Sequence, residues 1–166
     1  MEVRQMSTAF LFNENKVIMM KKEASKITDT VFWTGLGGHL EANELNFPKK
    51  ACVREIFEES GIQEEEIEEL KLRYILLRVK EEEIRQQFVY FGKTKRLKFI
   101  NSDEGELHWI DRDKILDMRL SKIISFMMKH YLENPNKNEI MVGTITINKD
   151  EDPEMQWSEL KDPKIF

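Results

Sequence analysis

Three glutamates near the middle of the chain have a spacing that could support metal chemistry. Glu55 and Glu58 are three residues apart, and Glu55 and Glu59 are four apart. On a helix, these spacings place all three side chains on one face. Neighbouring carboxylates repel one another, so helix stability alone does not favour the arrangement. A bound cation would relieve the repulsion.

The type of ligand indicates a hard cation. Carboxylate oxygens suit Mg²⁺ or Mn²⁺, whereas Zn²⁺ prefers His and Cys. Such an ion would neutralise a diphosphate, polarise its phosphorus and lower the pKa of a bound water. A free carboxylate nearby could then accept the proton. A solvated acidic helix is the competing interpretation, because the chain has another acidic run at residues 63–69.

A helix over residues 48–60 is predicted to position these acids. Pro48 suits its first turn, Asn46 could cap it, and Gly61 suits the left-handed position after its end. In the glycine cluster at residues 35–38, just upstream, we expect neither a packed strand nor a helix interior. The apolar residues of the helix recur at helical spacing: Ala51, Cys52, Val53 and Ile56.

The rest of the sequence predicts a mixed α/β (α+β) fold. A β-hairpin is expected from apolar runs at 7–12 and 16–20, joined by turn-like residues 13–15. Hairpins mixed with helices, instead of regular βαβ alternation, indicate a mixed sheet with helices on both faces. The other predicted elements are strands at 70–79, 84–93, 107–110 and 140–147, and helices at 114–118 and 120–132.

Length and composition fit a single domain over residues 1–166. The apolar fraction of 40% and the charged fraction of 34% are typical of a soluble globular protein. About 15 residues at the C-terminus are polar and include prolines, so we expect a surface-wrapping or partly disordered tail there.

Charge and cysteine content exclude several classes of protein. A net charge of −5 argues against electrostatic capture of nucleic acid, which needs clustered Lys and Arg. The single cysteine, Cys52, rules out an intrachain disulfide and suits a reducing compartment. No apolar run reaches the roughly 18 residues that a membrane span needs, and the N-terminal residues lack the apolar core of a signal peptide. We therefore expect a cytoplasmic protein without a membrane segment.

Residues 38–62 carry a specific motif. They resemble the Nudix box, Gly-x5-Glu-x7-Arg-Glu-U-x-Glu-Glu-x-Gly-U, where U is a bulky aliphatic residue. Gly38 and Glu44 match its first part, and residues 54–62, Arg-Glu-Ile-Phe-Glu-Glu-Ser-Gly-Ile, match the rest without a mismatch. Nine residues, instead of seven, separate Glu44 from Arg54. A loop absorbs such an insertion at low cost.

The resemblance implies the Nudix-type α/β/α sandwich, in which a mixed central sheet carries a catalytic loop–helix–loop. It also implies that Glu55, Glu58 and Glu59 bind Mg²⁺, which Mn²⁺ could replace. A backbone carbonyl of Gly37 or Gly38 would join them as a ligand. The same two glycines would border the phosphates of the substrate.

The resemblance gives Arg54 the role of orienting these acids through ion pairs, typically with Glu44. The insertion lies between these two residues and could displace Glu44. In that case Glu41 or Glu58 could take over the pairing with Arg54.

Members of the family often supply one more glutamate from a loop that precedes a Trp-containing strand, and residues 102–110 resemble that stretch. Glu104 is the first choice for a base or extra ligand and Glu106 the second, while Glu55 is a further candidate for the base. Solvated loop acids are the competing interpretation. His39 follows the glycines and could contact substrate, although a structural or exposed histidine fits equally well.

The resemblance implies a Mg²⁺-dependent hydrolase of a diphosphate linkage in a nucleoside diphosphate derivative. We favour a nucleoside triphosphate, oxidised or intact, cleaved to monophosphate and pyrophosphate. ADP-ribose, dinucleoside polyphosphates and nucleotide sugars are alternatives. A non-catalytic nucleotide-sensing module would not need three repelling acids, and an isoprenoid diphosphate isomerase lacks support from a second His/Glu cluster. The expected partner is a small-molecule nucleotide, and the segment after Asn134 could serve as a homodimer interface.

Overall fold

The computed structural model describes residues 1–23 and 30–165. In chain order, its elements are β1 (Glu2–Asn13), β2 (Lys16–Glu23), β3 (Val31–Thr34), β4 (Leu36–His39), η1 (Ala42–Glu44), α1 (Pro48–Ser60), η2 (Glu64–Glu66), β5 (Glu68–Lys80), β6 (Glu83–Lys93), β7 (Glu106–Asp111), η3 (Arg112–Asp117), α2 (Lys122–Glu133), β8 (Met141–Ile147) and β9 (Pro153–Glu159), where η marks a 3₁₀ helix. Among the described residues, no helix has the length and apolar character that a bilayer-spanning segment needs.

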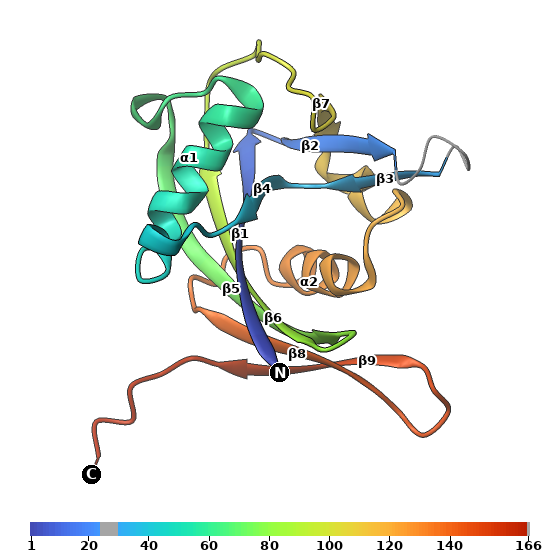
Figure 1. The fold of residues 1–166 in the computed structure, drawn as a ribbon. Coiled ribbons are helices and arrows are strands. Elements are labelled where there is room, and N and C mark those ends of the chain that lie inside the picture. The colour runs from blue at the N-terminus through green and yellow to red at the C-terminus, as the bar shows by residue number, and fades with distance from the viewer. Residues whose placement is uncertain (24–29, 166) are drawn as a thin grey trace.

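The strands form one mixed sheet in the order β3-β2-β1-β6-β5-β8-β9, and β4 and β7 add to it beside β1 and β2 (Figure 1). The β1–β6 and β5–β8 pairs are parallel, and the other pairs are antiparallel. The predicted mixed sheet is therefore confirmed.

Side chains on β1 alternate between two cores, as the two-residue period of a strand requires. Ala9 and Leu11 pack in a cluster that contains Ile56 of α1. Phe10, between them, packs in a second cluster that contains Met127 of α2. The two helices therefore cover opposite faces of the sheet, which confirms the predicted sandwich.

Helix α1 has the predicted bounds, but its start is capped differently from the prediction. Gly61 adopts a left-handed backbone (φ 74°) and donates its N–H to the Phe57 carbonyl at 2.8 Å, as expected for a residue that ends a helix. The prediction of Asn46 as the cap is wrong, because the N-cap residue is Phe47 and no side chain caps the helix. Pro48 in the first turn lacks an N–H, so one fewer donor needs a cap.

The glycine cluster forms a strand, contrary to prediction. Gly37 and Gly38 belong to β4 and pair antiparallel with Thr8 and Ser7 of β1. A Cβ on Gly38 would lie 2.5 Å from Glu55 Oε1. A Cβ on Gly37 would overlap the backbone carbonyl of Ser7, so the close approach of β4 to β1 requires glycine at that position.

The polar C-terminal segment also forms a strand, β9, where a surface-wrapping tail was expected. It pairs antiparallel with β8, and Met155 and Trp157 pack against the core cluster on the α2 face. Pro153 stands at the first position of the strand, where its missing N–H is tolerated. Residues 160–165 follow without regular structure and are exposed, and Phe166 lies outside the described residues.

Candidate active site

Of the three predicted metal ligands, Glu59 is buried and Glu55 is partly buried, both between α1 and β4. Glu59 is only 3% exposed, and its Oε2 accepts the Gly37 N–H at 2.7 Å. The Glu55 side chain is 14% exposed and lies against Gly38. Glu58, in contrast, has a side chain that is 54% exposed. A solvated acidic face therefore does not describe Glu55 and Glu59, because these carboxylates have lost most of their water.

Arg54 connects the predicted acids through a network of ion pairs. Its Nε and Nη2 donate to the two carboxylate oxygens of Glu44 at 2.8 and 2.9 Å. Its Nη1 donates to Glu55 at 2.9 Å and to Glu58 at 3.0 Å. The guanidinium thus orients three carboxylates at once, in the geometry that makes arginine a strong partner for them.

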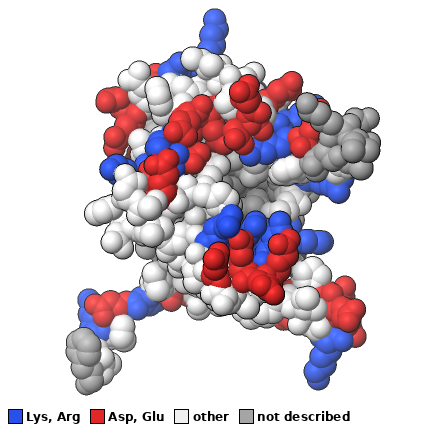
Figure 2. All heavy atoms as spheres, in the orientation of Figure 1, with Lys and Arg blue, Asp and Glu red and all other residues white. Residues whose placement is uncertain are grey.

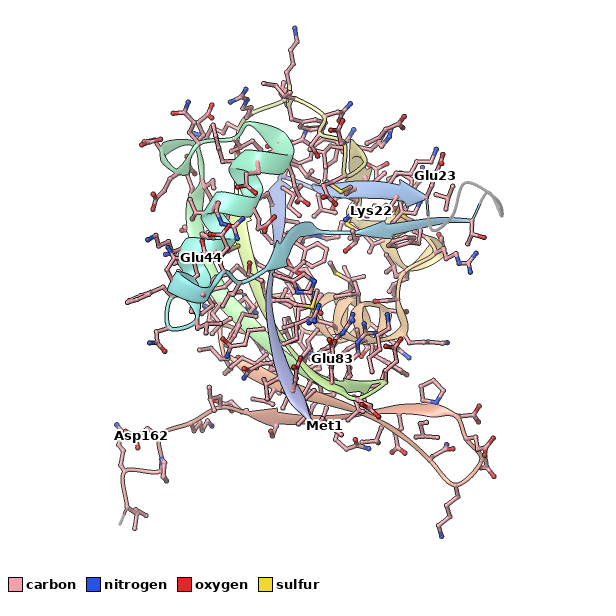
Figure 3. All side chains as sticks on the ribbon, in the orientation of Figure 1. Met1, Lys22, Glu23, Glu44, Glu83 and Asp162 are labelled. Carbon is pink, nitrogen blue, oxygen red and sulfur yellow. The ribbon has the colours of Figure 1, made fainter. Side chains whose placement is uncertain are left out.

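Glu44 keeps its predicted place despite the insertion. It is 2% exposed and lies beside the start of α1 (Figure 3), where it also accepts the backbone N–H of Glu41 at 2.9 Å. Hydrogen bonding from Arg54 holds the pKa of Glu44 at about 2. The stretch before the helix absorbs the extra residues, since Leu45 and Phe47 in it are half-exposed or more.

Burial disfavours the ionised forms of Glu55 and Glu59. Desolvation raises the pKa of Glu59 to about 7, although the hydrogen bond from Gly37 and the charge of Lys22 act in the opposite direction. Desolvation likewise raises the pKa of Glu55, against the hydrogen bond from Arg54. The negative charge of Glu104 raises both values further. A positive ion at this position would reverse these shifts.

Glu104 is the downstream acid that the fold brings to this group. Its carboxylate acts electrostatically on both buried acids and pairs with Lys22 Nζ at 3.2 Å. Lys22 lies near the end of β2 (Figure 3). The Glu106 side chain is about as exposed as that of Glu104 (65% against 62%), but it lies 3.3 Å from His108 Nε2 instead. Glu104 is therefore close enough to Glu55 and Glu59 to act on their charge, and no such effect of Glu106 on them is found among the described residues.

The residues present fit a hard divalent cation. In this conformation, no three Asp, Glu, His or Cys side chains of the described residues are arranged to enclose a metal ion. Arg54 holds Glu55 and Glu58 in ion pairs instead. The donors are nevertheless all oxygens, which suits Mg²⁺ or Mn²⁺, and the buried carboxylates lack a full counter-charge. Glu55, Glu59 and a glycine carbonyl could hold the ion, and Glu58 could join by leaving Arg54.

His39 lies on the opposite side of β4 from the acids, because side chains alternate along a strand. Its side chain is exposed. The pKa of His39 is nevertheless lowered, mainly by partial desolvation of the ring and then by the positive charges of Arg4 and Arg85. It therefore belongs to a group on the α2 face of the sheet.

That group is a row of arginines that the sequence analysis did not find. Arg4 of β1 is paired in register with Arg85 of β6, which is paired with Arg78 of β5. Glu83 bridges Arg4 at 2.8 Å and Arg85 at 3.1 Å. Figure 2 shows Lys and Arg gathered with acids below a hollow, with an acidic patch above it, and Figure 3 places Glu83 in the lower region. The signal is strand register, which the sequence alone does not supply.

Comparison with known proteins gives a consistent result. Residues 4–131 match the model of the NUDIX domain family. Among curated protein sequences, none matches the chain.

Solved structures show the same fold at low identity. The MutT protein from Bacillus halodurans is 21% identical, with a TM-score of 0.66, over 93% of this chain and 97% of that one. MutT from Methanosarcina mazei is 20% identical, with a TM-score of 0.67, over 82% and 97%. A C. elegans Ap4A hydrolase is 12% identical, with a TM-score of 0.62, over 80% and 96%.

Proposed function

The chain belongs to the Nudix family of hydrolases, which act on pyrophosphate bonds, and on that premise we propose that it cleaves a nucleoside triphosphate to the monophosphate and pyrophosphate. The observation that carries the proposal is the pair of buried carboxylates, Glu55 and Glu59, against the glycines of β4. Buried acids with raised pKa values are costly to maintain, and such groups cluster at functional sites.

Each residue of the site has a role in this proposal. Glu55 and Glu59 would hold Mg²⁺ or Mn²⁺ with Gly37 or Gly38, and Glu58 would be the third carboxylate available to the ion. The bound ion would neutralise phosphate charge and make a water more acidic.

The other residues orient the acids and handle the proton. Glu104 would accept the proton of the attacking water, and its ion pair with Lys22 at 3.2 Å orients its carboxylate. Arg54 keeps the acids in place, anchored by Glu44. Because Arg54 also pairs with both oxygens of Glu44, it would stay in place even if Glu55 and Glu58 turned toward a metal ion.

Positive charge elsewhere suits a polyphosphate substrate. Lys22 lies next to the acids. On the face of β4 where His39 lies, Arg4 and Arg85 share the carboxylate of Glu83, and Arg78 is paired in register with Arg85, so this row can offset the charge of an anionic group. A compact single domain is the reason for choosing a nucleoside triphosphate over larger substrates. Because one similar structure is an Ap4A hydrolase, dinucleoside polyphosphates belong in the test.

A substrate panel with Mg²⁺ tests the proposal. It contains the nucleoside triphosphates and their oxidised forms, ADP-ribose, dinucleoside polyphosphates and nucleotide sugars. We expect the highest kcat/KM on a triphosphate, with equal amounts of monophosphate and pyrophosphate released. A higher kcat/KM on another compound would overturn the choice of substrate. Binding without turnover on every compound would overturn the hydrolase assignment.

A further inference from the structure

A charged cavity, apart from the candidate active site, lies on the α2 face of the sheet. Its volume is about 410 Å³. Phe12, Phe91 and Tyr131, which line it, belong to the core cluster of α2, whereas α1 and its acids cover the other face. The strand ends of β1 and β6, the start of β5, the first residue of η3 and the segment after α2 all contribute to its lining. The cavity is therefore separate from the candidate active site.

The charge of this cavity is strongly positive. Lys71, Arg73, Lys93 and Arg112 line it, with Glu69 as the one acid among its lining residues. Glu69 pairs with Lys93 at 2.8 Å. The whole chain has a net charge of −5, so this concentration of cations is not a consequence of general basicity.

Both arginines are held in place by aromatic rings. The Arg112 guanidinium lies 4.9 Å from the centroid of Phe12 and 5.5 Å from that of Tyr131, and its Nη2 donates to Tyr131 Oη at 3.1 Å. The Arg73 guanidinium lies 5.9 Å from the centroid of Phe91, and its Nη2 donates to the carbonyl that follows α2 at Lys137. Stacking on aromatic faces suits arginine and limits its motion.

Each of these arginines also has an unused donor. The Nε atoms of Arg73 and Arg112 are buried and have no hydrogen-bond partner among the described residues. A buried donor without a partner is costly, and such groups are rare in folded proteins. Two of them in one cavity, on fixed guanidinium groups, form a site prepared for an acceptor.

We propose that this cavity binds a multiply charged phosphate compound, at a site distinct from the one that hydrolyses nucleotides. A guanidinium presents parallel N–H groups that match two phosphate oxygens. The Nε–H groups of Arg73 and Arg112 each supply one donor for a phosphate oxygen, and Lys71 and Lys93 supply further charge. A polyanion satisfies the orphaned donors and neutralises the excess of cations at once, which a neutral ligand does not.

Titration of the intact protein with inorganic pyrophosphate, followed by calorimetry in EDTA, tests this site. Without a divalent cation, the acids of α1 repel the probe, so binding there does not contribute. Arg73→Gln and Arg112→Gln should each weaken binding about tenfold or more, because each removes charged hydrogen bonds. In wild type, the arginine Nε–H signals in the NMR spectrum should shift on addition of pyrophosphate, and the two variants identify those signals.

Because Arg112 packs on core rings, a variant with milder structural effects is also needed. Lys71→Gln combined with Lys93→Gln removes two exposed charges from the cavity, and should weaken binding while leaving the melting temperature near that of wild type. The matched control, Lys95→Gln with Lys98→Gln, removes two exposed lysines outside it and should bind as wild type does. Wild-type affinity weaker than about 1 mM, unshifted Nε–H signals, or equal weakening in the control pair would each overturn the proposal. None of these outcomes depends on catalytic activity.

Discussion

The buried acids of α1 and the cationic cavity beside α2 present the same physical problem with opposite signs. Desolvation raises the pKa of both Glu55 and Glu59, and Arg73 and Arg112 bury unused donors. In both places, a folded chain keeps like charges together that would be more stable apart. The comparison teaches that a counter-ion from outside would stabilise each region, a cation on the α1 face and an anion on the α2 face.

The largest expected effect on activity comes from removing a carboxylate from the acidic region. Glu55→Gln should lower kcat roughly 1,000-fold, because several kcal/mol of transition-state stabilisation depend on the metal ion it holds. Steady-state kinetics on the best substrate of the panel would measure the loss. Glu65→Gln, an exposed acid of η2, serves as the control and should retain wild-type kcat. Comparable rates for the two variants would remove Glu55 from the site.

The next effect concerns the loop acid that completes the site. Glu104→Gln should lower kcat about 100-fold, the usual contribution of a positioned general base. Glu106→Gln should change kcat far less, since Glu106 lies beside His108, whereas Glu104 acts electrostatically on Glu55 and Glu59. Rates measured over a range of pH would show whether an ionisation is lost with Glu104. Equal, small losses in both variants would contradict the assignment.

The third expected effect is on stability, and it tests the ion pair between Glu44 and Arg54. Glu44→Gln should reduce the free energy of unfolding at neutral pH by about 2 kcal/mol, because it weakens charged hydrogen bonds from Arg54. The pKa of Glu44 is about 2 in the folded protein and ordinarily 4.5. Its stabilisation is therefore complete above the ordinary value and is lost as pH falls toward the lower one.

Urea unfolding of wild type and Glu44→Gln across this pH range would measure the difference. The gap between the two proteins should narrow as the solution becomes more acidic. A gap that stays constant with pH would show that the Arg54–Glu44 ion pair is not its cause.

The smallest expected effect is an increase in the stability of the folded protein when Glu59 is replaced by Gln in the absence of metal. The pKa of Glu59 is about 7 in the folded protein and ordinarily 4.5, so the native state binds more protons than the unfolded state between these values. Stability must therefore fall as pH rises through this window. In EDTA, Glu59→Gln should be more stable than wild type by roughly 1–2 kcal/mol at about pH 8 and equal to it at about pH 4. Thermal unfolding at both pH values checks this, and a destabilised variant at the higher pH would contradict it.

The two regions also differ in how far the sequence predicts them. The helix acids, Arg54 and Gly61 lie within one short segment, where spacing and capping rules act locally, and the helix has the predicted bounds. The burial of Glu59 was not predictable from that segment, because it depends on the contact between β4 and α1. Glycine is usually a sign that a strand is interrupted, but in β4 it permits close packing against β1, so the prediction from glycine content was wrong here.

The cavity and the arginine row depend on contacts between distant segments. Arg73 and Arg112 meet only when β5 and η3 come together around the end of α2. Arg4 and Arg85 become neighbours only through the β1–β6 register. No periodicity in the sequence reports such contacts. The strand β9 was missed for a related reason, since its alternating Met155 and Trp157 stand among polar residues and gain their partners from the core of the α2 face.

Direct measurement of metal binding tests the central claim that the buried acids of α1 hold a divalent cation. Free Mn²⁺ can be followed by electron paramagnetic resonance as wild type, Glu59→Gln and Glu65→Gln are titrated. Wild type and Glu65→Gln should bind alike, and Glu59→Gln should bind at least about tenfold more weakly. Wild-type affinity should also rise between about pH 6 and about pH 8, as the raised pKa of Glu59 requires. Binding by Glu59→Gln that equals wild type would contradict the account.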